Sequence, residues 1–156
     1  MDGDNKKIID ELFLFAKENM DSRKVYPYVS FIVKEGNIIS KGSNQEAETF
    51  DLTNQDEVVS IRAAQRSLDT GSLAGYSLYS FFEPTMLAFD VALWSGVTDF
   101  HWCINSTSYP SSYNQMNYHV ADYAKDHPGK ITIQSGIQET EALQLVKEAE
   151  EKGYRI

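Results

Sequence analysis

The sequence predicts an α/β protein in which helices cover both faces of a mixed five-stranded sheet. Helical and strand-like patterns alternate along the chain, two β-rich runs are joined by a short turn, and no repeat or linker divides the 156 residues. A chain of this length is commonly one domain with its own core. We therefore expect a single three-layer α-β-α domain over residues 1–156.

The first third of the chain predicts a helix followed by a β-hairpin. Apolar residues recur at helical spacing over residues 5–20. Residues 27–34 (PYVSFIVK) are apolar and β-rich, and the turn Glu35-Gly36-Asn37 leads into a second strand over residues 38–43. Such strands pair antiparallel. The polar segment 44–53 should then lead to a central helix.

The central helix begins within residues 51–62, DLTNQDEVVSIR. Thr53 or Asn54 can cap its first turn, and an acidic residue three positions later (Asp56 or Glu57) completes a capping box. Helical spacing predicts a core-facing stripe of Val58, Ile61, Ala64 and Leu68. The helix should end near residues 69–71.

Strand and helix signals continue to alternate in the second half. Residues 76–82 predict a buried strand, Pro84 suits the first position of a helix over 85–94, and Gly96 ends that helix. A strand over 97–104, a loop over 105–113, a helix over 115–126, a strand over 130–134 and a helix over 139–152 should follow. This order favours helices packed on a mixed five-stranded sheet.

Composition excludes several classes of protein. A hydrophobic share of 42% with 12% aromatic residues argues against a disordered chain. No apolar run reaches the length of a membrane span, and the start MDGDNKK does not resemble a signal peptide. Cys103 is the one cysteine, so a disulfide within the chain and a cysteine-rich metal site are excluded. We expect a cytoplasmic protein.

The charge balance bears on partners. The net charge is −9. Nucleic-acid binding depends on Lys and Arg that neutralise phosphates, so this acidic chain argues against nucleic acid as a main partner.

Several motifs occur in a fixed order between residues 27 and 96. They are the hairpin 27–36, Asn44, Asp51-x-Thr53, Glu57, Ile61-Arg62, the strand 78–80, Glu83-Pro84, and Trp94 shortly before Gly96. In this order they resemble the zinc-dependent nucleobase and nucleoside deaminases, and most closely the branch of guanine deaminase and tRNA adenosine deaminase. The resemblance covers about residues 5–104 and implies the cytidine-deaminase-like fold.

The same resemblance tests the chemistry. In these enzymes one His and two Cys hold Zn²⁺, which activates a water, and a Glu shuttles protons; the signature is H-x-E…P-C-x-x-C. By this resemblance the histidine position is Gln55, the glutamate is Glu57, and the cysteine positions are Thr85 and Ala88. Zinc takes thiolate, imidazole or carboxylate donors. We therefore expect no cofactor, and Glu57 is the candidate catalytic residue, either vestigial or still active.

Other metal sites are weaker alternatives. His101 and Cys103 share one face of a strand, where packing or ligation would explain them. Glu57, Glu83 and Asp56 offer oxygen donors for a hard cation such as Mg²⁺, although Asp56 is expected to project away from Glu57.

Two further positions allow two interpretations each. Asn44 is either a turn residue or, by the resemblance, a contact to substrate. Asp90 lies within an apolar helix and faces either solvent or a subunit interface, since these helices pack dimers in related enzymes.

Three functional hypotheses follow. The chain is a catalytically inactive pseudo-deaminase acting as a partner subunit; or a nucleobase or nucleoside binder with a pocket formed by Asn44, Gln55, Thr85 and Ala88; or a hydrolase that acts on a nucleobase-like substrate through Glu57 with no zinc or a different metal. The first two are compatible. The resemblance also implies a homodimer, and no membrane partner is expected.

Overall fold

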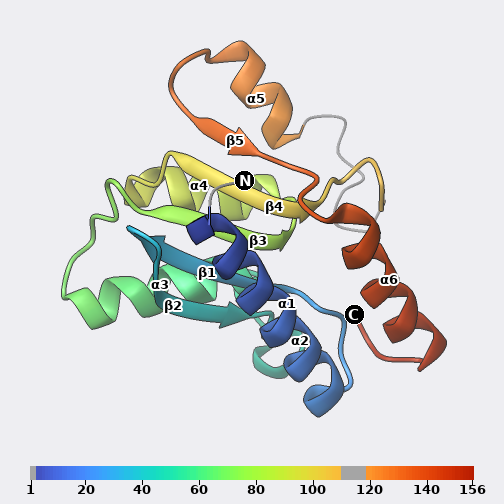
Figure 1. Cartoon of the computed structure of the whole chain (residues 1–156). Coiled ribbons are helices and arrows are strands. Elements are labelled where there is room, and N and C mark those ends of the chain that lie inside the picture. The colour runs from blue at the N-terminus through green and yellow to red at the C-terminus, as the bar shows by residue number, and fades with distance from the viewer. Residues whose placement is uncertain (1–2, 110–118) are drawn as a thin grey trace.

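The computed structural model describes residues 3–109 and 119–156, in which helices and strands alternate (Figure 1). The predicted α/β class is confirmed. The elements are α1 (Gly3–Arg23), β1 (Val29–Lys34), β2 (Asn37–Ser43), α2 (Glu46–Thr49), α3 (Asp56–Leu68), β3 (Ser77–Phe82), α4 (Met86–Ser95), β4 (Asp99–Ile104), α5 (Val120–Asp126), β5 (Thr132–Gln134) and α6 (Glu139–Glu151).

The five strands form one mixed sheet in the order β2-β1-β3-β4-β5. β1 pairs antiparallel with β2 and β3, whereas β3, β4 and β5 run parallel. Both the hairpin and the mixed sheet were predicted. Because β3 and β4 are parallel neighbours, the residues that follow them lie at one edge of the sheet, where α/β proteins commonly bind ligands.

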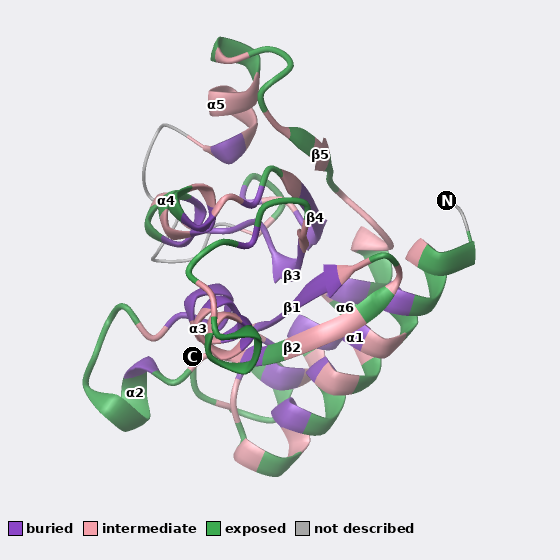
Figure 2. Ribbon diagram, turned by 90° about the vertical axis from the view of Figure 1, so that its left-hand side faces the viewer, coloured by how far each residue is buried: buried purple, intermediate pink, exposed green. Residues whose placement is uncertain are grey.

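Each face of the sheet has its own apolar core. Successive residues of a strand point to opposite faces, so Phe31 packs with α1 and α6 while Ile32 packs with α3 and α4. Figure 2 shows the buried residues gathered between the helices and the sheet. The three-layer prediction is therefore correct. Trp102 and Phe89 are fully buried in the second core.

Helix α3 packs closely on β2 at Gly42. A Cβ atom at Gly42 would lie 2.1 Å from the main-chain oxygen of Asp56 and 2.6 Å from the main-chain nitrogen of Ser60. Only glycine permits this approach, which sets the position of the first turn of α3.

The start of the central helix differs from the prediction. Its N-cap is Gln55, without a side-chain capping bond. Thr53 instead donates its hydroxyl to Asp51 at 2.7 Å, and the Asn54 amide donates to Thr49 Oγ1 at 2.8 Å. The capping box was wrong because the preceding loop engages both side chains.

Smaller differences lie elsewhere. The polar segment 44–53 contains the short helix α2, and Leu68, predicted in the core, is 37% exposed at the end of α3. Pro84 precedes the N-cap Thr85 and is not the first helical residue. In the helix predicted over 115–126, residues 115–118 lie outside the described residues, and α5 begins at Val120. No described helix has the length and apolarity to cross a membrane.

Candidate functional site

The first turns of α3 and α4 meet beside the end of β3. Gln55 is the N-cap of α3 and Thr85 the N-cap of α4. The Thr85 hydroxyl donates to Gln55 Oε1 at 2.5 Å. Thr85 Oγ1 also accepts a hydrogen bond from the main-chain nitrogen of Ala88 at 3.2 Å. The structure thus brings together Gln55, Thr85 and Ala88, three of the four predicted ligand-binding residues.

The chemistry of these three side chains does not fit zinc. Gln55 offers an amide, Thr85 a hydroxyl and the buried Ala88 a methyl group, whereas protein zinc sites use thiolate, imidazole or carboxylate. In addition, the side chains of Gln55 and Thr85 are hydrogen-bonded directly to each other, which engages the amide oxygen of Gln55. Among the described residues, no group of three His, Cys, Asp or Glu is arranged to hold a metal ion.

Glu57 lies in a buried network of hydroxyl groups. Its Oε1 accepts a hydrogen bond from Ser80 on β3 at 2.8 Å, and its main-chain oxygen accepts one from Ser60 at 2.9 Å. Ser60 and Ser30 on β1 share a further hydrogen bond of 2.8 Å. Sequence reasoning missed these serines. The available signal was the presence of Ser30 and Ser80 within two strands whose other residues are mostly apolar.

The carboxyl groups of Asp56 and Glu57 influence each other, contrary to the expectation that Asp56 projects away. Each residue is only 4% exposed. Burial, followed by repulsion from Glu57, raises the pKa of Asp56 well above its ordinary value. Burial also raises the pKa of Glu57, although the hydrogen bond from Ser80 opposes this. Both groups therefore hold protons more tightly than exposed carboxyls do.

Asn44 lies apart from this centre. Its Oδ1 accepts a hydrogen bond from the main-chain nitrogen of Glu46 at 3.0 Å, as a turn residue does. It lines a separate hollow of about 340 Å³, together with Glu46, Ala47, Phe50, Leu52 and Ile156. The turn role is therefore present, and contact with a ligand stays a prediction.

A second polar cluster lies at the same sheet edge. Glu83 Oε2 accepts hydrogen bonds from the main-chain nitrogen and the hydroxyl of Ser106, at 2.9 and 2.7 Å. Ser106 Oγ also lies 3.0 Å from His119 Nδ1. The other oxygen of Glu83 is buried without a partner in the described structure. Glu83 is thus hydrogen-bonded to Ser106. Among the described residues it does not form a metal-binding group with Asp56 and Glu57.

His101 and Cys103 do not contribute a joint metal site. The His101 ring lies 2.9 Å from Asp99 and 3.1 Å from Gln134, and it stacks on Tyr79. Cys103 lies in the core beneath α1 and α6, where burial raises the pKa of its thiol to about 12. Packing explains both residues.

The sequence is similar to one deaminase over about half of its length. It is 43% identical to a tRNA-specific adenosine deaminase of Aquifex aeolicus over 72 residues, which are 46% of this chain and 47% of that protein. The chain therefore matches about half the length of this relative. No family model matches the sequence.

Solved structures resemble the whole fold. A structure of tRNA:A34 deaminases, which edit adenosine to inosine at the tRNA wobble position, matches with a TM-score of 0.70 and 20% identity, over 86% of this chain and 96% of that one. Guanine deaminase from Nitrosomonas europaea matches with a TM-score of 0.73 and 19% identity, over 88% and 81%. The protein NE0047, solved in complex with 2,6-diaminopurine, matches with a TM-score of 0.76 and 20% identity. The match covers 90% of this chain and 78% of that one.

At these identities the structural likeness establishes the fold, and the sequence similarity to the tRNA-specific adenosine deaminase agrees with it. The chain therefore has the cytidine-deaminase-like fold of these solved structures.

Proposed function

We propose that this chain is a pseudo-deaminase: a deaminase-fold protein without zinc-dependent catalysis that binds a nucleobase or nucleoside, alone or as a partner subunit. The direct hydrogen bond between Gln55 and Thr85 carries this proposal. It joins the positions that correspond to a zinc-binding histidine and cysteine in the enzymes this chain resembles. A side-chain amide and a hydroxyl are neutral groups suited to hydrogen bonding rather than to Zn²⁺.

The polar side chains of Gln55 and Thr85 support recognition of a nucleobase. Gln55 has an amide N–H₂ group in addition to the oxygen that Thr85 occupies. A Gln or Asn amide can read the edge of a heterocycle, as it reads adenine in DNA. One structural relative was solved with 2,6-diaminopurine bound. We propose Gln55, Thr85 and the buried wall at Ala88 as the pocket, while contact between Asn44 and a ligand stays a prediction from the resemblance.

The test has two stages. Protein purified without a metal-affinity tag is analysed for zinc, then screened by thermal shift against guanine, adenine, cytosine and their nucleosides. We expect substoichiometric zinc and a shift with at least one compound. Gln55→Ala should abolish that shift, whereas Gln144→Ala, at an exposed position on α6, should retain it. Zinc near one per chain, or ammonia release from any compound, would overturn the pseudoenzyme proposal. A flat panel would overturn the binding role.

A hydrolase that uses Glu57 without zinc is the second candidate. The raised pKa of Glu57 favours it, because general acid–base groups are commonly tuned in this direction. Its hydrogen bond with Ser80 weighs against it, since one carboxylate oxygen is already engaged. Were a hydrolytic activity found, Glu57→Gln should abolish it, and an unchanged rate would exclude this role.

We further propose that the chain forms a homodimer through α4. This helix is apolar along its length, yet Trp94 is 92% and Leu87 41% exposed. An exposed apolar helix face is typical of a protein interface. Asp90, exposed on the same stripe, would then lie at the interface.

Sedimentation velocity tests the dimer with a matched pair of variants. Trp94→Ser should produce monomers, whereas Phe50→Ser removes an aromatic side chain that is 97% exposed elsewhere and should leave the dimer intact. A monomeric wild-type chain at micromolar concentration would contradict the proposal.

A further inference from the structure

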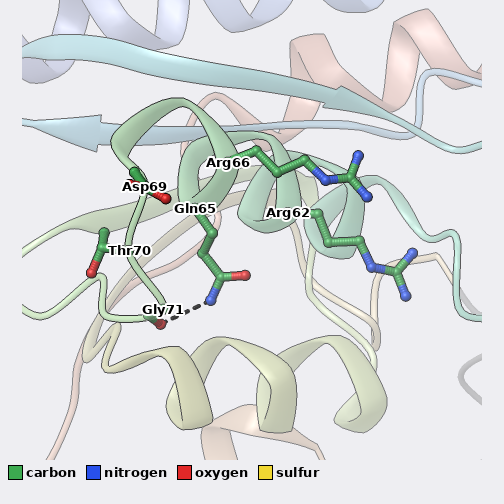
Figure 3. Close-up of a pocket in the computed structure, with 6 residues that line it drawn as sticks. All are labelled: Arg62, Gln65, Arg66, Asp69, Thr70 and Gly71. Carbon is green, nitrogen blue, oxygen red and sulfur yellow. Dashed lines mark hydrogen bonds between the residues drawn. The ribbon is translucent and has the colours of Figure 1, made fainter.

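A hollow lined by arginines lies beside the second half of α3. It measures about 360 Å³, and its walls are Arg62, Gln65, Arg66, Asp69, Thr70 and Gly71. Figure 3 shows both arginines reaching in the same direction from the helix, with Asp69 on the side away from their guanidinium ends. The hollow is separate from the Gln55 site, because none of its lining residues belongs to that site.

Arg62 is held in position before any ligand arrives. It donates to Asn54 Oδ1 at 2.5 Å and to Thr53 Oγ1 at 3.3 Å. A guanidinium has five N–H groups, so three stay available. A side chain that is already ordered loses less entropy when it binds a ligand.

Arg66 supplies the second positive charge. It lies one helical turn from Arg62, is exposed, and makes no side-chain hydrogen bond or ion pair within the described part of the chain. Two like charges four residues apart on a helix repel each other. An anion between them would remove this repulsion, and Arg binds oxyanions through two parallel hydrogen bonds.

The rim of the hollow is also ordered. Gln65 Nε2 donates to the main-chain oxygen of Gly71 at 2.9 Å, which holds the loop after α3 (Figure 3). Thr70 Oγ1 accepts a hydrogen bond from the main-chain nitrogen of Ser72 at 3.1 Å, and Thr70 lies on the same side as Asp69, away from the guanidinium ends (Figure 3). The Asp69 carboxylate opposes an anion and lowers the affinity to be expected.

We propose that this hollow binds a small oxyanion: phosphate or the phosphate group of a monoester. Two guanidinium groups match the oxygens of such an anion through paired hydrogen bonds. The net charge of −9 repels a long polyanion, because many of its phosphates would lie near the acidic surface of the protein. A single phosphate group is therefore favoured over nucleic acid. This inference does not depend on the proposed function, and neither fails with the other.

The experiment is an NMR titration of the whole chain, following the arginine Nε–H signals at constant ionic strength. Inorganic phosphate and glycerol 3-phosphate are the two probes, and chloride is the control anion. Arg66→Gln should weaken phosphate binding about tenfold or more, as expected for loss of a charge-assisted hydrogen-bonding group. Lys147→Gln removes an exposed helical cation on α6 and should leave affinity within about twofold.

Each outcome decides the matter. Saturable shifts at Arg62 and Arg66 in millimolar phosphate, weakened by Arg66→Gln alone, support the site. Tighter binding of the monoester would identify an organic phosphate as the ligand, whereas equal affinities would identify free phosphate. Shifts that match those in chloride, or equal effects of the two variants, would overturn the proposal.

Discussion

Replacing Asp56 by Asn should stabilise the protein at neutral and alkaline pH. Asp56 lies in the first turn of α3, is 4% exposed, and has Glu57 and the buried Glu46 as acidic neighbours. Burial and these charges raise its pKa in the folded state well above the ordinary 3.8. Between those two pKa values, the folded chain keeps a proton that the unfolded chain has released.

The sign of the effect follows from proton linkage. Stability is greatest below the unfolded pKa and falls as the pH rises toward the folded pKa, because the unfolded state then binds fewer protons. Each unit of upward shift costs about 1.4 kcal/mol at a pH above both values. Asn cannot ionise and has nearly the same shape. Asp56→Asn should therefore raise the free energy of unfolding at high pH, and the increase should grow as the pH rises.

Urea unfolding at pH 5, 6, 7 and 8 measures this difference. The gap between Asp56→Asn and the wild type should widen with pH. Asp10→Asn is the control, since the Asp10 side chain is 54% exposed, and its effect should change little over this range. A gap of equal size at pH 5 and pH 8 would refute the reasoning, because it would mean that Asp56 ionises as readily when folded as when unfolded.

Three further substitutions test the packing around the site by urea unfolding. Thr85→Val removes the cap of α4 and the donor to Gln55, and should cost about 1–3 kcal/mol, while Thr85→Ser should recover most of it. Ser106→Ala leaves the buried Glu83 with one main-chain donor and should cost about 1–3 kcal/mol; no loss would show that water replaces the hydroxyl. Gly42→Ala places a Cβ against α3 and should cost about 1–3 kcal/mol or more; a neutral result would mean that α3 shifts freely.

The elements were predictable where one local pattern dominates. The hairpin follows from β-rich runs around Glu35-Gly36-Asn37, and Gly96 ends α4 in the left-handed conformation that glycine favours. The start of α3 was not predictable in this way. Several residues could cap it locally, and contacts to Asp51 and Thr49 decided which side chains were free.

In the candidate site, too, some features follow from the sequence and others from the tertiary structure. The residue types at Gln55, Thr85 and Ala88, and hence the mismatch with zinc chemistry, are properties of the sequence alone. The hydrogen bond between Gln55 and Thr85, the serines around Glu57, and the hollow between Arg62 and Gly71 are decided by tertiary structure. These contacts join residues that no local periodicity relates. Whether a hydrogen bond forms depends on differences of a few tenths of an ångström in the donor–acceptor distance. Only the packing of the helices on the sheet determines those distances.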